Sequence, residues 1–103
     1  MLADEISTII KAFKDANIET VQKYLSEEIL LDNGGEDDIY GQEEVKTYLE
    51  EFFAANKTSA INLVHNGEKG DTQFFIVQYK SSKTYRIHFL LEKNQIIEIK
   101  IEE

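Results

Sequence analysis

Few side chains in this 103-residue sequence are of the types that carry out acid–base, nucleophilic or metal chemistry. The chain has two histidines and no cysteine, which excludes disulfides, thiolate nucleophiles and sulfur-ligated metals. Two-residue alternation places His65 on the same strand face as Ile61 and Leu63, near the strand end. His65 is therefore a candidate acid, base or rim ligand of a cavity, with a hydrogen-bonded structural histidine as the alternative. His88 is expected on the opposite face, so the two histidines are not predicted to form one site within a subunit.

An acidic loop, GGEDDIYG at residues 34–41, raises the question of calcium binding. Three acids fit positions 1, 5 and 12 of an EF-hand loop: Asp32, Glu36 and Glu43. However, Gly34 at position 3 has no side-chain oxygen, and Asp37 occupies the position that needs glycine. No nucleophile motif of the form G-x-S-x-G and no glycine-rich phosphate loop occurs. The sequence therefore predicts a solvated acidic loop and neither a metal site nor a cofactor.

The charge distribution restricts the partners that this protein can have. Twenty acidic and eleven basic residues give a net charge of −9. Residues 1–55 hold fourteen acids and four bases, whereas residues 56–103 hold six acids and seven bases. Such an imbalance is typical of solvated helix faces, with attraction of a cationic ligand or a basic partner as the alternative. Nucleic acids and anionic membrane surfaces are not expected as partners, because an acidic surface repels phosphates.

Length and composition predict one domain over residues 1–103, with 42% hydrophobic residues to build its core. No run of 18 apolar residues occurs, so no membrane span is predicted. Residues 1–5 lead into a predicted helix without a signal-peptide pattern. The expected location is the cytoplasm if the chain is complete, and the periplasm or the cell exterior if a leader was removed.

Hydrophobic periodicity predicts three helices and five strands. Helical spacing of apolar residues predicts helices at 4–15, 18–25 and 42–55. Alternation predicts strands at 27–33, 60–66, 72–80, 84–92 and 96–102. Short connections between the last four strands predict an antiparallel meander. The fold class is therefore α+β, with three helices packed on a curved, mostly antiparallel sheet in the order helix, helix, strand, helix and four strands.

The two faces of the predicted sheet differ in polarity. One face is nearly continuous hydrocarbon, which must meet the helices, and it consists of Phe75, Val77, Tyr79, Tyr85, Ile87, Phe89, Leu91, Ile97, Ile99 and Ile101. The opposite face is mixed and consists of Phe74, Ile76, Gln78, Arg86, His88, Leu90, Ile96, Glu98 and Lys100. Three helices cannot cover both faces, so Phe74, Ile76 and Leu90 are predicted to meet a second copy related by a twofold axis. Arg86 and His88 would lie in the same dimer interface.

The order of the elements resembles the nuclear transport factor 2-like superfamily, a cone-shaped α+β fold of the cystatin-like kind. The resemblance rests on Ile39–Gly41, EEFFAANK at 50–57, LVHNG at 63–67, YRIHFLLEK at 85–93 and the final IEIKIEE. The chain looks most similar to small bacterial members that are domains of unknown function, many of which look exported. The superfamily includes ketosteroid isomerase, dehydratases, transport adaptors and binding modules, so the resemblance implies a fold rather than one function.

The resemblance also implies a candidate catalytic acid. In isomerase-like members an acid on the first strand is the general base, and Asp32 lies at a comparable place after Leu30 and Leu31. Such a base needs a partly apolar pocket and a hydrogen-bond donor for the developing oxyanion, a role open to Tyr24 or Tyr40. The second acid expected from a late strand is absent. An aspartate before Asn-Gly-Gly is also typical of a turn.

These observations favour a non-catalytic, dimeric binding or interaction module. A small pocket is expected where the loops meet the wide end of the sheet, beside Tyr24, Tyr40, Asp32 and His65. Its ligand would be a small apolar molecule or a peptide. The alternative is a small isomerase or hydrolase with Asp32 or His65 as general base. A third hypothesis is an interaction protein that uses the outer sheet face or the acidic helices.

Overall fold

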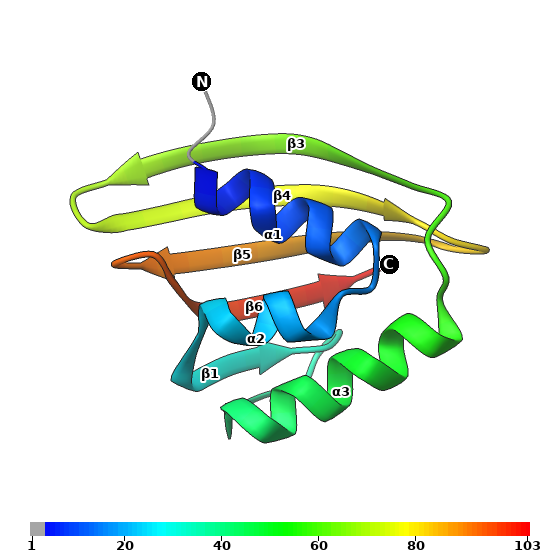
Figure 1. Ribbon diagram of the computed structural model, residues 1–103, viewed down its shortest axis with the longest axis horizontal. Helices are drawn as coiled ribbons and strands as arrows, with labels where there is room; N and C mark the ends of the chain where they lie inside the picture. Colours follow the sequence, from blue (N-terminus) through cyan, green and yellow to red (C-terminus); the bar gives the residue numbers. More distant parts are fainter. Residues whose placement is uncertain (1–3) are drawn as a thin grey trace.

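The computed structural model describes residues 4–103 (Figure 1). Its elements are α1 (Asp4–Lys14), α2 (Ile18–Tyr24), β1 (Leu25–Asp32), β2 (Asp37–Gly41), α3 (Gln42–Ala55), β3 (Ala60–Lys69), β4 (Thr72–Lys80), β5 (Thr84–Glu92) and β6 (Gln95–Glu102). The predicted α+β class and the order of the predicted elements are confirmed. Strand β2 is an addition that the sequence pattern did not predict.

One six-stranded sheet has the strand order β2-β1-β6-β5-β4-β3. Strands β3 to β6 form the predicted antiparallel meander, whereas β1 pairs with β6 in parallel and with β2 antiparallel. In Figure 1, α1 and α2 lie across one face of the curved sheet, and α3 runs along its β1 side. The parallel pairing brings the end of β1 beside the end of β6, which positions the site described below.

The space between the helices and the sheet is filled by hydrocarbon. Within residues 4–103 all buried residues are hydrophobic, and no polar or charged residue is buried. Phe13 of α1 packs edge-on against Phe53 at 5.2 Å and against Phe89 at 4.9 Å between ring centroids. Phe75 stacks on Phe89 at 4.4 Å. No helix in this part of the chain has the length and apolar character needed to cross a membrane.

The segment predicted as an acidic loop, 34–41, contains the short edge strand β2. Its residues Asp37–Gly41 pair with Glu28–Asp32 of β1. Aspartate and glycine have low strand propensity, so this strand depends on pairing with β1 rather than on its own sequence pattern. The turn before it is held by the Asn33 N–H, which donates to the Glu36 carbonyl at 3.3 Å. Charged side chains on such an edge discourage pairing with other chains.

A β-bulge in β6 corrects the predicted inward set. Ile96 pairs with Leu91 and Glu98 pairs with Leu90, which leaves Ile97 as an extra residue. Ile96 is therefore fully buried and Ile97 is only partly buried, the reverse of the prediction. Period-two alternation cannot reveal a bulge, because one inserted residue exchanges the faces of everything before it.

A second bulge, in β3, moves His65 to the face turned away from the helices, which we call the outer face. Leu63 keeps its inward position, Val64 is the extra residue, and His65 pairs with Ile76. Ile76 pairs on its other side with His88. The prediction that His65 shares a face with Leu63 and lies opposite His88 is therefore wrong. Both histidines project from the outer face, two strands apart.

Candidate ligand-binding site at the open end of the sheet

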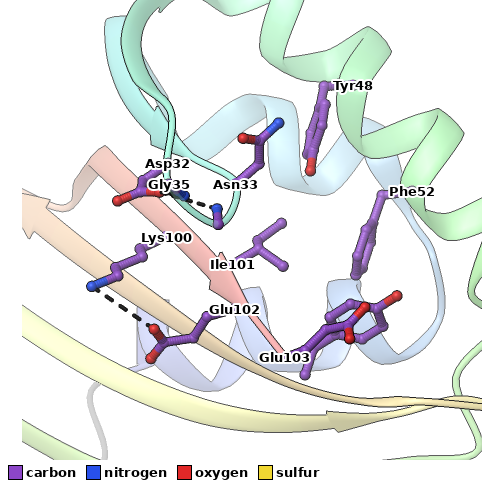
Figure 2. Close-up of a pocket in the computed structure, with 11 residues that line it drawn as sticks. Asp32, Asn33, Gly35, Tyr48, Phe52, Lys100, Ile101, Glu102 and Glu103 are labelled. Carbon is purple, nitrogen blue, oxygen red and sulfur yellow. Dashed lines mark hydrogen bonds and ion pairs between the residues drawn. The ribbon is translucent and has the colours of Figure 1, made fainter.

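A hollow among the described residues, which we call the mouth hollow, opens where β1 ends before β6 does. Asp32 and Lys100 form the last pair between these strands, and β6 continues to Glu102. The hollow has a volume of about 720 Å³ and lies between α3, the β1–β2 turn and the end of β6 (Figure 2). Its lining combines the aromatic and apolar side chains of Tyr48, Phe52, Tyr85 and Ile101 with Asp32, Asn33, Gly34, Gly35, Lys100, Glu102 and Glu103. The volume is in the range of small-molecule sites.

One wall of the hollow, which we call the mouth wall, carries three aromatic residues: Tyr48, Phe52 and Tyr85. Tyr48 and Phe52 are one helical turn apart on α3, and both point toward the region of Ile101 in Figure 2. The Phe52 ring lies 5.1 Å from the Tyr85 ring. Burial raises the pKa of Tyr48, against a smaller opposing contribution from the Asn33 side chain. The Tyr48 phenol therefore stays neutral at physiological pH and can donate a hydrogen bond.

Asn56, at the C-cap of α3, holds this wall in place. The Tyr85 hydroxyl donates to Asn56 Oδ1 at 3.0 Å, and the Tyr79 hydroxyl donates to the Asn56 carbonyl at 2.5 Å. Asn56 Nδ2 in turn donates to the Phe52 carbonyl at 3.1 Å. These contacts fix the end of α3 to β4 and β5. The sequence prediction missed Asn56, although asparagine is common at helix C-termini.

Asp32 stabilises the β1–β2 turn. Its Oδ1 accepts hydrogen bonds from the N–H groups of Gly34 at 3.1 Å and Gly35 at 3.3 Å. These bonds hold the pKa of Asp32 below its usual value, with a smaller contribution from Lys100. In Figure 2 its carboxylate lies on the Lys100 side, away from Tyr48. A carboxylate stabilised in its charged form is a weak general base.

A second hollow, the α3–β2 groove, adjoins the mouth hollow across Asn33 and Tyr48. Its volume is about 460 Å³, and Tyr40 lies in its lining. Tyr24 packs partly buried against the core and lines neither hollow. Of the four predicted ligand-binding residues, the structure brings Asp32 and Tyr40 to neighbouring hollows and places Tyr24 and His65 elsewhere. No group of three or more metal-ligating side chains occurs between residues 4 and 103.

The outer face carries the predicted interface residues Phe74, Ile76, Arg86, His88 and Leu90. His88 Nε2 lies 2.8 Å from Glu102 Oε1, and Lys100 Nζ lies 3.9 Å from Glu102 Oε2. A shallow hollow of about 150 Å³ lies among Phe74, Ile76, Leu90, His88 and Glu98. This face therefore combines apolar side chains with polar and charged ones.

Residues 6–103 match the family model of a domain of unknown function, DUF4783. The chain belongs to this family. A DUF4783 family protein from Bacteroides ovatus is 25% identical, with a TM-score of 0.88, over 94% of this chain and 93% of its own. A nuclear transport factor 2-like protein of unknown function from Cytophaga hutchinsonii is 21% identical, with a TM-score of 0.68, over 96% of this chain and 86% of its own. A de novo designed protein with a curved β-sheet is 19% identical, with a TM-score of 0.79, over 95% of each chain.

A search of the curated proteins gives no match. The comparisons confirm the predicted nuclear transport factor 2-like fold and the predicted resemblance to domains of unknown function. Membership of the DUF4783 family assigns no activity, and likeness at 19–21% identity concerns the fold alone. The function must be argued from the site.

Proposed function

We propose that this protein is a non-catalytic binding module whose mouth hollow holds a small, largely apolar ligand or the side chain of a bound peptide. The observation that carries the proposal is the contrast between a filled interior and an open hollow of about 720 Å³ at one end of the sheet. Phe52 and Ile101 offer apolar surface, and the Tyr48 hydroxyl offers a hydrogen bond beside it. A pocket of this kind binds by burying apolar area and orients its ligand through few polar groups.

The geometry gives less support to a small isomerase or hydrolase. Asp32 is committed to two backbone N–H groups, which weakens it as a base. His65 is exposed on the outer face, on the far side of the sheet from the mouth wall. Neither residue therefore combines basicity with an apolar pocket, which proton abstraction requires.

Ligand retention tests the proposal. The protein would be incubated with a mixture of small hydrophobic compounds and examined by native mass spectrometry. We expect retained compounds, and we expect Tyr85→Ala to lower their retention about tenfold, because Tyr85 forms one wall of the hollow. Tyr24→Ala is the matched control, since Tyr24 lines neither hollow. Absence of any retained compound, or equal losses in the two variants, would refute the mouth hollow as the binding site.

We also propose that the outer face joins two copies of the chain about a twofold axis. One row of side chains crosses five strands, from Phe74 on β4 through Leu90 on β5, Glu98 on β6 and Leu30 on β1 to Ile39 on β2. Phe74 and Ile39 are exposed, and the helices pack on the opposite face. A mostly apolar row that no helix covers is typical of a protein–protein interface. A twofold axis would let the row of one copy cover the same row of a second copy.

Light scattering coupled to gel filtration tests the dimer. We expect the native protein to have the mass of two chains and Leu90→Glu to have the mass of one, because the change buries a charge in the interface. Thr84→Glu adds the same charge at an exposed β5 position away from the apolar row and should leave the dimer intact. A native monomer at high concentration would contradict the proposal.

A further inference from the structure

The α3–β2 groove has an apolar floor and an acidic wall. Leu31 of β1, Tyr40 of β2 and Tyr48 of α3 supply the hydrocarbon and aromatic surface. Three glutamates of α3 line the same groove: Glu43, Glu44 and Glu51. No lysine or arginine lines it. The apolar floor of the groove can therefore bury a hydrocarbon chain, and its glutamates attract only positively charged groups.

The acidic lining comes from two separate segments of the chain. A smaller hollow of about 290 Å³ shares Leu31, Asn33 and Tyr40 with the groove, and its other lining residues are Glu36, Asp37 and Asp38. None of the acids in either hollow forms an ion pair with another described residue. Like charges that converge on one concave surface repel one another and concentrate a negative potential there. A bound cation would relieve that repulsion.

Two of the glutamates are held in position by neutral donors. Glu43 Oε1 accepts a hydrogen bond from the side-chain amide of Gln22 at 3.0 Å. Glu44 Oε1 accepts one from the Gly41 N–H at 3.3 Å, at the start of α3. These bonds leave the net charge of both carboxylates uncompensated and use one oxygen of each. Both groups are therefore oriented in advance for a charged ligand.

We propose that the α3–β2 groove binds a linear organic polycation, an aliphatic amine with ammonium groups separated by methylene chains. Its methylenes would lie on Leu31 and the tyrosines, and its ammonium groups would meet the glutamates. Glu44 and Glu51 are seven residues apart, which is about 10 Å along a helix and close to the length of a linear triamine. Only Asn33 and Tyr48 are shared with the mouth hollow, so this inference stands independently of the proposed function.

Titration of the protein with spermidine at low ionic strength, followed by calorimetry and amide NMR, tests the site. We expect saturable binding and shift changes concentrated at Tyr40, Thr47 and Glu51. Glu51→Gln should weaken binding about three- to tenfold, because one of the carboxylates in contact is lost. Glu68→Gln makes the same charge change on β3, at the opposite edge of the sheet, and should weaken binding less than about twofold.

A second pair of variants adds a protein cation. Thr47 is exposed on α3 and lines the groove, so Thr47→Lys should place an ammonium group where the ligand binds and reduce the affinity at least about tenfold. Thr84→Lys is the control with equal charge outside the groove. Circular dichroism of both variants verifies that the fold is retained.

Three outcomes would overturn the inference. One is an equal loss of affinity in the groove variants and their controls, which would indicate unspecific attraction to an acidic protein. Another is complete displacement of spermidine by magnesium chloride at matched ionic strength. The third is tighter binding of a lysine-rich peptide than of spermidine, which would assign the groove to a protein partner. Tyr85→Ala should leave spermidine affinity unchanged. Failure of the mouth-hollow proposal can therefore be distinguished from failure of the groove proposal.

Discussion

The two faces of the sheet belong to the same strands but differ in exposure and polarity. On the inner face, Phe75, Ile87 and Phe89 are at most 2% exposed, and all buried residues of the described part of the chain are hydrophobic. On the outer face, the alternating positions carry Ile76, His88 and Leu90, which are partly exposed and lie beside charged groups. Each face is therefore constrained by what covers it: helices on one side, and water or a partner on the other.

The contrast supports the proposal that ligands bind away from the interior. The buried residues of the described interior are all hydrophobic and supply stability, and they present no buried polar side chain to a ligand. The polar groups that could recognise a ligand gather instead at the mouth hollow, the α3–β2 groove and the outer face. Substitutions of interior residues should therefore lower stability, whereas substitutions at the two hollows or on the outer face should mainly change binding.

The largest expected effect is a difference in the free energy of unfolding lost when two phenylalanines on adjacent strands are each replaced by alanine. Phe89 is 2% exposed, stacks on Phe75 and meets Phe13 edge-on, so Phe89→Ala should lower the free energy of unfolding by about 3–5 kcal/mol. Phe74 is 37% exposed on the outer face, and Phe74→Ala should cost about 1 kcal/mol in the monomer. Urea denaturation of both variants measures the difference. Comparable losses would mean that the outer face is as tightly packed as the core.

The sequence predicted the inner face well because hydrophobic burial imposes a period that local residues reveal. The helices and the predicted strands follow from that period, and the short connections between the last four strands predict the meander. The two bulges did not, because Val64 and Ile97 are ordinary strand residues whose extra position appears only in the pairing with β4 and β5. His65 was assigned to the wrong face for this reason.

The candidate site was harder to predict than the core. Its position depends on where β1 ends relative to β6, a parallel pairing between segments about 70 residues apart that no local pattern indicates. Asp32 and Tyr40 were identified from a resemblance and from residue type, and both lie at hollows. Tyr48 and Phe52 fall within the predicted helix at 42–55, but no sequence pattern marked them as part of the mouth wall.

Gly67→Ala tests how closely the outer face is packed. A Cβ at Gly67 would lie 2.6 Å from Phe74 Cε1, so the ring must move. We expect a loss of about 1–2 kcal/mol in the free energy of unfolding, since overpacking at the surface is partly relieved by rotation of the ring. In a Phe74→Ala background the same change should cost less than about 0.5 kcal/mol. A double-mutant cycle gives the coupling, and its absence would show that Phe74 does not constrain Gly67.

A smaller effect is expected for the contact between His88 and Glu102 on the outer face. His88 and Glu102 are each about one-third or more exposed, so Glu102→Gln should change the free energy of unfolding by about 0–1 kcal/mol. Ile101, the adjacent residue on the inner face, provides the comparison, because Ile101→Ala should cost about 2–4 kcal/mol. Thermal unfolding of the two variants measures both values. An effect of Glu102→Gln as large as that of Ile101→Ala would show that the contact between His88 and Glu102 is protected from solvent, for example by a second copy.

The smallest effect concerns Asp32, at the end of the outer face. Hydrogen bonds from the N–H groups of Gly34 and Gly35 lower its pKa in the folded chain, so its charged form favours folding. This contribution is complete above the ordinary aspartate pKa, about 4, and is lost as pH falls through the lower folded value. The stability difference between the native protein and Asp32→Ala should therefore shrink only below about pH 4. Carboxyl carbon NMR should give a titration midpoint for Asp32 below that of aspartate in a short peptide. A midpoint at or above the peptide value would mean that the turn does not hold the carboxylate, and Asp32 would again be a candidate base.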